Sequence, residues 1–183
     1  MDPVDLLLHP VRLRIVHAMS GGRTLTTTQL CARLSDVPKA TLYRHVGLLA
    51  TAGVLEVHAE QRVRGSVERS YRLRQERPVI DADAAAAMSL DEHRRGFGAA
   101  MAALLAEFQA YLGRDGADPV ADSVSYRQFT LWLSDAELAE MIDEVSAALI
   151  SRARNQPAAG RTPHLLATIM FPTDRPDPRE PGQ

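Results

Sequence analysis

The segment DVPKATLYRHVGLLATAG, residues 36–53, has the pattern of an amphipathic helix that follows a turn. Asp36 is a candidate N-cap, Pro38 suits a first helical turn, and Gly53 stands where helices commonly end. Three apolar residues recur at i, i+4 and i+7, the spacing of one buried face: Leu42, Val46 and Leu49. The segment therefore predicts a helix with one core-facing side and one free polar side.

Two further helices are predicted upstream of this segment. In PVDLLLHPVRLRIVHAM, residues 3–19, the chain is expected to leave helical geometry at His9, because a residue before proline avoids it. The part after Pro10 is expected to place three residues in the core: Leu13, Val16 and Ala18. TLTTTQLCARLS, residues 24–35, predicts a short helix with Thr26 or Thr27 as its N-cap. A tight turn, SDVP, joins it to the 36–53 helix.

A basic hairpin is predicted downstream, in VLEVHAEQRVRGSVERSYRLR, residues 54–74. Apolar residues alternate along two extended runs, and Gly65-Ser66 supplies a turn between them. The tip is expected to carry Arg62, Arg64 and Arg69. Three helices with a short turn between the last two, followed by a hairpin, predict a winged helix-turn-helix.

The segments LLLHPVRLRIVHAM, QLCARLSDVPKATLYRHVGLLATAGVLEV and RGSVERSYRL resemble the ArsR-type winged-helix transcriptional regulators. The resemblance covers about residues 4–74, and TLYRHVGLL and AGVLEV are its most specific parts. It implies a DNA-binding regulator and favours a repressor over an activator.

The charge is divided unevenly along the chain. The net charge is −2, yet residues 1–75 hold eleven positive side chains against six acids, a net +5, while residues 76–183 carry a net −7. A basic half is a candidate for nucleic acid. In such a domain the N-terminal residues of the second helix reach base edges in the major groove.

Arg44 is expected to hold a guanine edge in bidentate fashion, and Lys39 to hold a base or a phosphate. His45 is as compatible with a phosphate contact as with a structural hydrogen bond at the buried edge of the helix. The predicted DNA-binding residues are Thr27, Pro38, Lys39, Ala40, Thr41, Tyr43, Arg44, His45, Arg62, Arg64 and Arg69.

A metal site is not expected. Many ArsR-type members bind metals through cysteines at the start of the third helix, where this chain has Thr26 and Thr28, and hydroxyls do not replace thiolate ligands. Cys31 stands alone among apolar residues, as a small core residue does. Asp91 and His93 resemble half of a second, helix-borne site whose other half is missing.

Neither catalysis nor a cofactor is expected, since no G-x-S-x-G, P-loop or G-x-G-x-x-G motif occurs. The lone cysteine, the acidic start MDPVD and the short apolar runs favour a cytoplasmic protein without a membrane partner.

The second half predicts a small helix-strand-helix-strand unit. Capping boxes at Ser89-x-x-Glu92 and Ser134-x-x-Glu137 begin two helices. SVSYRQFTLWL, residues 123–133, and HLLATIMF, residues 164–171, are extended in pattern. The predicted fold class is α+β, with a winged helix-turn-helix at 1–75, a dimerisation and effector unit at 76–172, and a disordered tail at 173–183.

A homodimer is expected, because pairing two copies would complete the sheet of this unit and would place two DNA-binding domains on a palindromic operator. The apolar residues of this unit have two interpretations: they line a cavity for a small apolar effector, or they are ordinary core residues. The cavity residues would be Phe97, Met101, Phe108, Phe129, Trp132, Met141 and Met170. The function predicted is a homodimeric repressor of transcription, and the alternative is a winged-helix module for protein–protein interaction without specific DNA binding.

Overall fold

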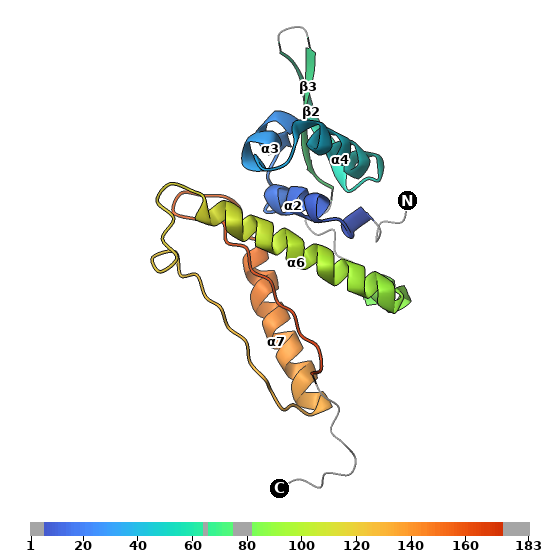
Figure 1. Cartoon of the computed structure of the whole chain (residues 1–183), viewed down its shortest axis with the longest axis vertical. Helices are drawn as coiled ribbons and strands as arrows, with labels where there is room; N and C mark the ends of the chain where they lie inside the picture. Colours follow the sequence, from blue (N-terminus) through green and yellow to red (C-terminus); the bar gives the residue numbers. More distant parts are fainter. Residues whose placement is uncertain (1–5, 64–65, 75–81, 174–183) are drawn as a thin grey trace.

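The N-terminal part of the chain folds as a helical domain with a three-stranded sheet (Figure 1). The computed structural model describes residues 6–63, 66–74 and 82–173. The helices are α2 (Pro10–Met19), α3 (Thr27–Arg33) and α4 (Lys39–Thr51), and the strands are β1 (Leu25–Thr26), β2 (Leu55–Val63) and β3 (Ser66–Leu73). The sheet is antiparallel in the order β1-β3-β2. The helices, the turn and the hairpin predicted for this half are confirmed, and β1 is an addition.

Local sequence signals fix where these helices begin and end. His9 is the N-cap of α2, and its Nδ1 accepts a hydrogen bond of 3.2 Å from the Val11 amide. Thr26 caps α3 and forms a capping box with Gln29. α4 starts after Pro38 without a side-chain cap, so the prediction that Asp36 caps it was wrong. Gly53, with φ +75°, follows the helix in the left-handed conformation that glycine tolerates.

The core lies between α2, α3, α4 and the start of β2. The predicted stripe of α4 is fully inside it, together with side chains from each neighbouring element: Leu42, Val46, Leu49, Ile15, Met19, Leu30 and Leu55. On α2, Leu13 and Ala18 are only half-buried, and Ile15 and Met19 fill the core in their place. Arg12 and Arg14 are also buried, and Arg14 is bonded to Glu107 on α6 (Leu90–Leu112), which packs against α2.

The second half consists of α5 (Ala82–Ala87), α6 (Leu90–Leu112) and α7 (Asp135–Ala153). Both predicted capping boxes, at Ser89 and at Ser134, are confirmed. α6 crosses beneath α2 (Figure 1) and buries two small side chains, Ala99 and Ala103. Small side chains at a helix crossing let the two axes approach closely. No described helix is long and apolar enough to cross a membrane.

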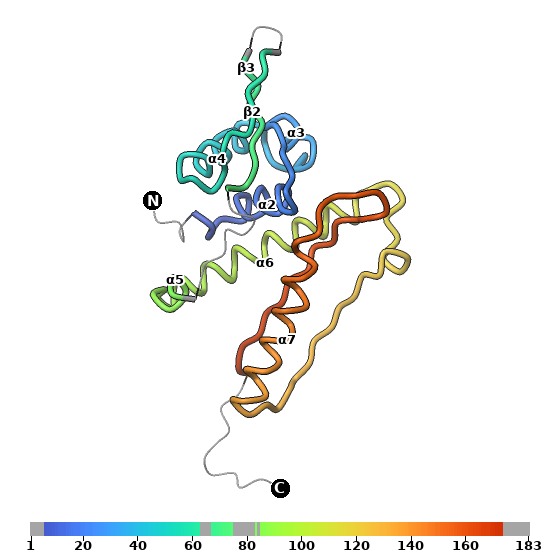
Figure 2. The backbone as a smooth tube through the Cα atoms, turned by 180° about the vertical axis from the view of Figure 1, so that it is seen from behind, coloured from blue at the N-terminus to red at the C-terminus, as the bar shows by residue number. Residues whose placement is uncertain are grey.

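The two strands predicted in this half do not form in the single chain. Residues 123–133 and 164–171 are extended and lie on either side of α7, as Figures 1 and 2 show from opposite directions. A strand needs a neighbour to bond its amide and carbonyl groups, and these segments do not pair with each other or with any other described segment. The helix-strand-helix-strand arrangement is therefore not confirmed. Residues 75–81, where the two predicted domains join, and residues 174–183 of the predicted 173–183 tail lie outside the described residues.

Candidate nucleic-acid interface

The turn between α3 and α4 sets the angle at which α4 leaves the core. The Val37 amide donates to the Leu34 carbonyl at 3.0 Å, and both side chains are buried. The Leu42 amide then donates to the Pro38 carbonyl at 3.1 Å, which starts α4. Because the buried stripe of α4 holds one side against the core, its opposite side is left facing outward beside the hairpin (Figure 1).

The outward side of α4, here called the α4 face, consists of the exposed Lys39, Tyr43 and Arg44 and the half-buried Thr41. Pro38 and Ala40 are exposed at its N-terminal end. Between this face and α3 lies a hollow of about 320 Å³, lined by Thr28, Cys31, Ala32, Lys39 and Tyr43. The α4 face thus continues onto α3.

Thr28 and Cys31 border this hollow, and Cys31 also packs against the core, as the sequence predicted, although it is not fully buried. Thr28 is exposed and Cys31 is half-buried, so both belong to the surface that surrounds Lys39 and Tyr43. The two residues lie one turn apart on α3, so the sequence shows that they share a side of this helix. It does not show which side of α3 lies beside α4, and they could therefore not be assigned to the interface from the sequence.

Two residues predicted to bind DNA are buried instead. His45 is 3% exposed and its ring lies 4.4 Å from that of His9, so it cannot reach a phosphate. Neither ring nitrogen of His45 has a hydrogen-bond partner among the described residues. Burial, with the nearby His9, Arg44 and Arg12, lowers the pKa of His45 to about 4, which keeps it neutral at pH 7. Thr27, the first residue of α3, is also buried.

Of the predicted tip arginines, the structure describes Arg62 and Arg69. Arg62 is exposed near the end of β2. Arg69 lies on β3, where its Nε donates to Glu60 Oε1 across the ladder at 2.7 Å. Both partners are more than half exposed, so this ion pair is weak enough to be exchanged for a phosphate. Arg64 lies outside the described residues.

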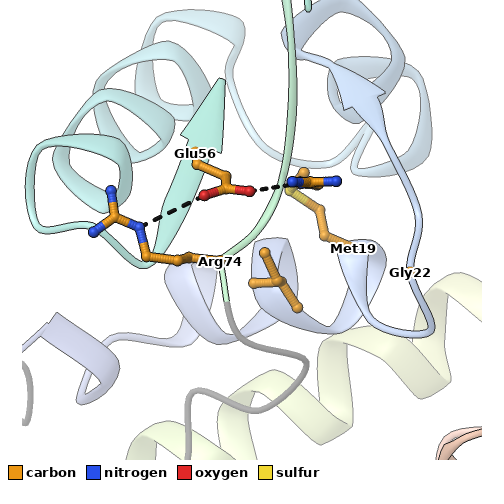
Figure 3. Close-up of a pocket in the computed structure, with 6 residues that line it drawn as sticks. Met19, Gly22, Glu56 and Arg74 are labelled. Atoms are coloured by element: carbon orange, nitrogen blue, oxygen red, sulfur yellow. Dashed lines mark hydrogen bonds and ion pairs between the residues drawn. The ribbon is translucent and has the colours of Figure 1, made fainter. Parts of the chain in front are cut away.

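The base of the hairpin is held by a carboxylate between two arginines (Figure 3). Glu56 accepts a hydrogen bond of 2.6 Å from Arg72 and lies 3.7 Å from Arg74. A hollow of about 200 Å³ beside them reaches Met19 and Gly22. These two arginines share one carboxylate, so they contribute less free positive charge than the composition of residues 1–75 suggests.

Arg14 joins the interface to the second half of the chain, and the sequence analysis missed it. The side chain is 3% exposed, and its Nη1 and Nη2 donate to the two carboxylate oxygens of Asp36 at 2.5 and 2.9 Å. Its Nε donates to Glu107 Oε1 on α6 at 2.8 Å. The hydrogen bonds from Arg14 hold the pKa of Asp36 below its usual value. An ion bridge thus ties α2 and α6 to the turn that precedes α4.

The residues predicted to line an effector cavity are not brought together in the single chain. Phe129 and Trp132 are 75% and 88% exposed in the 123–133 segment, and Phe97 and Met170 are also exposed. Met101, Phe108 and Met141 are half-buried on α6 and α7. The rings that do meet are Phe97 with Phe171 and Phe108 with Tyr126, edge to face at 6.5 and 6.0 Å.

In the described part of the chain, no three His, Cys, Asp or Glu side chains gather as a metal-binding cluster. Asp91, half of the incomplete site considered above, pairs with Arg94 one turn along α6.

A family of helix-turn-helix domains matches residues 7–58, which span α2, α3, α4 and the first part of β2. The match covers the α4 face and the turn before it. No curated protein matches the chain. The N-terminal part is therefore a helix-turn-helix domain, a fold typical of DNA-binding regulators.

Proposed function

We propose that the protein is a homodimeric transcriptional repressor that acts in the cytoplasm and binds an operator through α4 and the hairpin. The observation that carries the proposal is the α4 face, an exposed polar surface at the start of the second helix of a helix-turn-helix domain. The preceding turn and the buried stripe hold it outward. The resemblance to ArsR-type regulators supports repression over activation.

The side chains of the α4 face have the chemistry that duplex DNA requires. Arg44 offers two parallel donors that match O6 and N7 of guanine, a contact worth about 1 to 3 kcal/mol of discrimination. Lys39 is at the first position of α4, where a cation and the free amides of the helix end can bind one phosphate together. Arg62 on the hairpin would hold the backbone beside the site.

Dimerisation is proposed because one DNA-binding domain contacts only a few base pairs through its recognition helix. Helix-turn-helix regulators place two such domains on half-sites about 10 bp apart, or multiples of that. The second half of the chain is the part that would supply the contact between copies. The binding of an apolar effector to this half, with a change in the spacing of the two DNA-binding domains, remains a prediction made from the sequence.

Capture of genomic fragments by the purified full-length protein, followed by sequencing, tests this function. We expect enrichment of an imperfect inverted repeat whose half-sites are separated by about one duplex turn. The Lys39→Ala and Arg44→Ala variants should lose this enrichment, and Arg95→Ala, on α6, should keep it.

Capture without any enriched sequence would contradict operator binding. If Lys39→Ala and Arg44→Ala disrupted a protein contact and left DNA retention unchanged, the interaction-module alternative would be correct.

A further inference from the structure

The second half of the chain lacks an interior of its own. α7 has no buried residue along its 19 residues, and the two buried residues of α6 face α2. Both helices expose large apolar side chains: Phe97, Leu105, Leu112, Ile142, Val145 and Ile150. A helix with this pattern is stabilised chiefly by packing of its apolar side, so the single chain leaves the unit incomplete.

The two extended segments, residues 123–133 and 164–171, also leave most of their backbone groups without partners in the described part of the chain. Among the described residues, no backbone hydrogen bond involves residues 125–133 or 164–171. Both segments expose large apolar side chains, among them Trp132 and Phe129 in the first segment and Leu166 and Phe171 in the second. Extended apolar segments with unpaired amides and carbonyls are templates for pairing with another chain.

The exposed area of the chain is larger than a folded monomer of its mass requires. The accessible surface is 14019 Å² for 20.0 kDa, whereas folded monomers of this mass expose roughly 8,700 Å². Obligate homodimers bury about 2,000 to 5,000 Å² in total over both partners. The part of this surface that a second copy could cover is the set of exposed apolar side chains on α6, α7 and the two extended segments.

We propose that a second copy of this chain completes the unit, and that residues 123–133 and 164–171 become β-strands by pairing with the same segments of that copy. The proposal rests on the homodimer of the proposed function and specifies its interface. The paired strands form a shared sheet that covers the apolar sides of α6 and α7.

The segments are suited to pairing with their own copies. A two-fold contact places each segment against identical sequences, where like charges would repel. Arg127 is the one Lys, Arg, Asp or Glu side chain in the two segments. Both run in the same direction along α7 (Figures 1 and 2), and within the described residues no backbone hydrogen bond occupies residues 125–133 or 164–171.

The oligomeric state and the amide protection of the full-length protein test this interface. Sedimentation should show twice the mass of the 20.0 kDa chain at micromolar concentration. Hydrogen exchange should show protected amides in residues 125–133 and 164–171. A monomer would overturn the proposal, as would a dimer whose amides in both segments exchange at the rate of an unstructured chain.

A proline substitution separates strand pairing from other modes of association. Thr130 is exposed in the first segment, and Thr130→Pro removes one amide donor in each copy. We expect Thr130→Pro to raise the dimer dissociation constant by about 100-fold or more, and Thr130→Ala to change it less than tenfold. Protection of the α2 and α4 amides in the same exchange experiment verifies that the variant is folded. Equal dissociation constants for the two variants would overturn strand pairing.

Binding of a generic DNA duplex by the same preparations distinguishes this proposal from the proposed function. A strand-paired dimer without salt-sensitive DNA binding would overturn the DNA-binding function alone. A monomer that binds DNA, or that associates with an apolar ligand or another protein through these segments, would overturn the strand-paired dimer and the homodimer of the proposed function, and would leave DNA binding through α4 standing.

Discussion

Arg14 shows how a single buried charge connects distant parts of this sequence. Its position on an amphipathic helix gave no sign of burial, because its partners lie 22 and 93 residues away. A guanidinium can be buried only when its donors are paired, and Asp36 and Glu107 supply three acceptor contacts. The bridge explains why Asp36 does not cap α4: its carboxylate is bonded to Arg14.

The Glu107→Gln substitution should destabilise the protein by about 1 to 3 kcal/mol, because it removes a charge from a nearly buried pair with Arg14. Urea unfolding at a fixed protein concentration measures this change. The exposed Glu140→Gln on α7 is the matched control and should change the free energy of unfolding by less than about 0.5 kcal/mol. If the two variants are equally stable, Arg14 does not depend on α6.

The buried His45 should make stability depend on pH. Its pKa is about 4 in the folded protein, against an ordinary value of 6.5, so the unfolded chain binds the proton more tightly between these values. Stability is therefore complete above pH 6.5 and falls as the pH drops towards 4. Burial also lowers the pKa of His17 and of His9, which adds to the same slope.

Urea unfolding at pH 7 and pH 5 should show a loss of up to about 2 kcal/mol that is attributable to His45. The His45→Leu variant should reduce the pH dependence by this amount, because leucine has no imidazole to take up a proton on unfolding. His93→Gln, an exposed histidine on α6, serves as the control and should retain the wild-type slope. An unchanged slope in His45→Leu would contradict the account.

Among the elements, those with local signals were predictable and those that depend on distant partners were not. The capping boxes of α6 and α7, the stripe of α4 and Gly53 each act within a few residues. β1 has only two residues and exists because it pairs with Tyr71 and Ser70 of β3. The β-branched and aromatic residues of the 123–133 segment indicated an extended chain, but only a neighbouring strand makes such a chain a β-strand.

The crossing of α2 and α6 depends on small side chains, and it provides a test at the scale of elements. Ala103 is 0% exposed, so Ala103→Leu should force the helices apart and cost about 1 to 3 kcal/mol in the free energy of unfolding. Ala102→Leu, one residue away on the exposed side of α6, should be nearly neutral. Thermal or urea unfolding of both variants measures the difference, and equal stability would show that α6 is not packed on α2.

At the scale of the whole molecule, the two halves differ in charge and in completeness. The +5 of residues 1–75 belongs to the half with a closed core and the α4 face, although Arg14, Arg69 and Arg72 are engaged by carboxylates. The acidic half leaves its apolar sides open. The charge division and the need of the second half for a second copy were both expected from the sequence. The sequence did not show that residues 123–133 and 164–171 lack strand partners within the described single chain, because an extended pattern does not identify the neighbour that would pair with it.

The central claim, that the α4 face reads DNA, is tested most directly by the salt dependence of affinity for the captured operator and for a scrambled duplex. For the full-length wild type, log K should fall linearly with log salt, with a slope of about −0.9 per neutralised phosphate.

Lys39→Ala should make this slope shallower by about 1 on both duplexes. Arg44→Ala should weaken operator binding by about 1 to 3 kcal/mol and bring it towards the scrambled duplex. Arg95→Ala should match the wild type. Wild-type affinity that is independent of salt, or Lys39→Ala and Arg44→Ala variants indistinguishable from Arg95→Ala, would contradict the account.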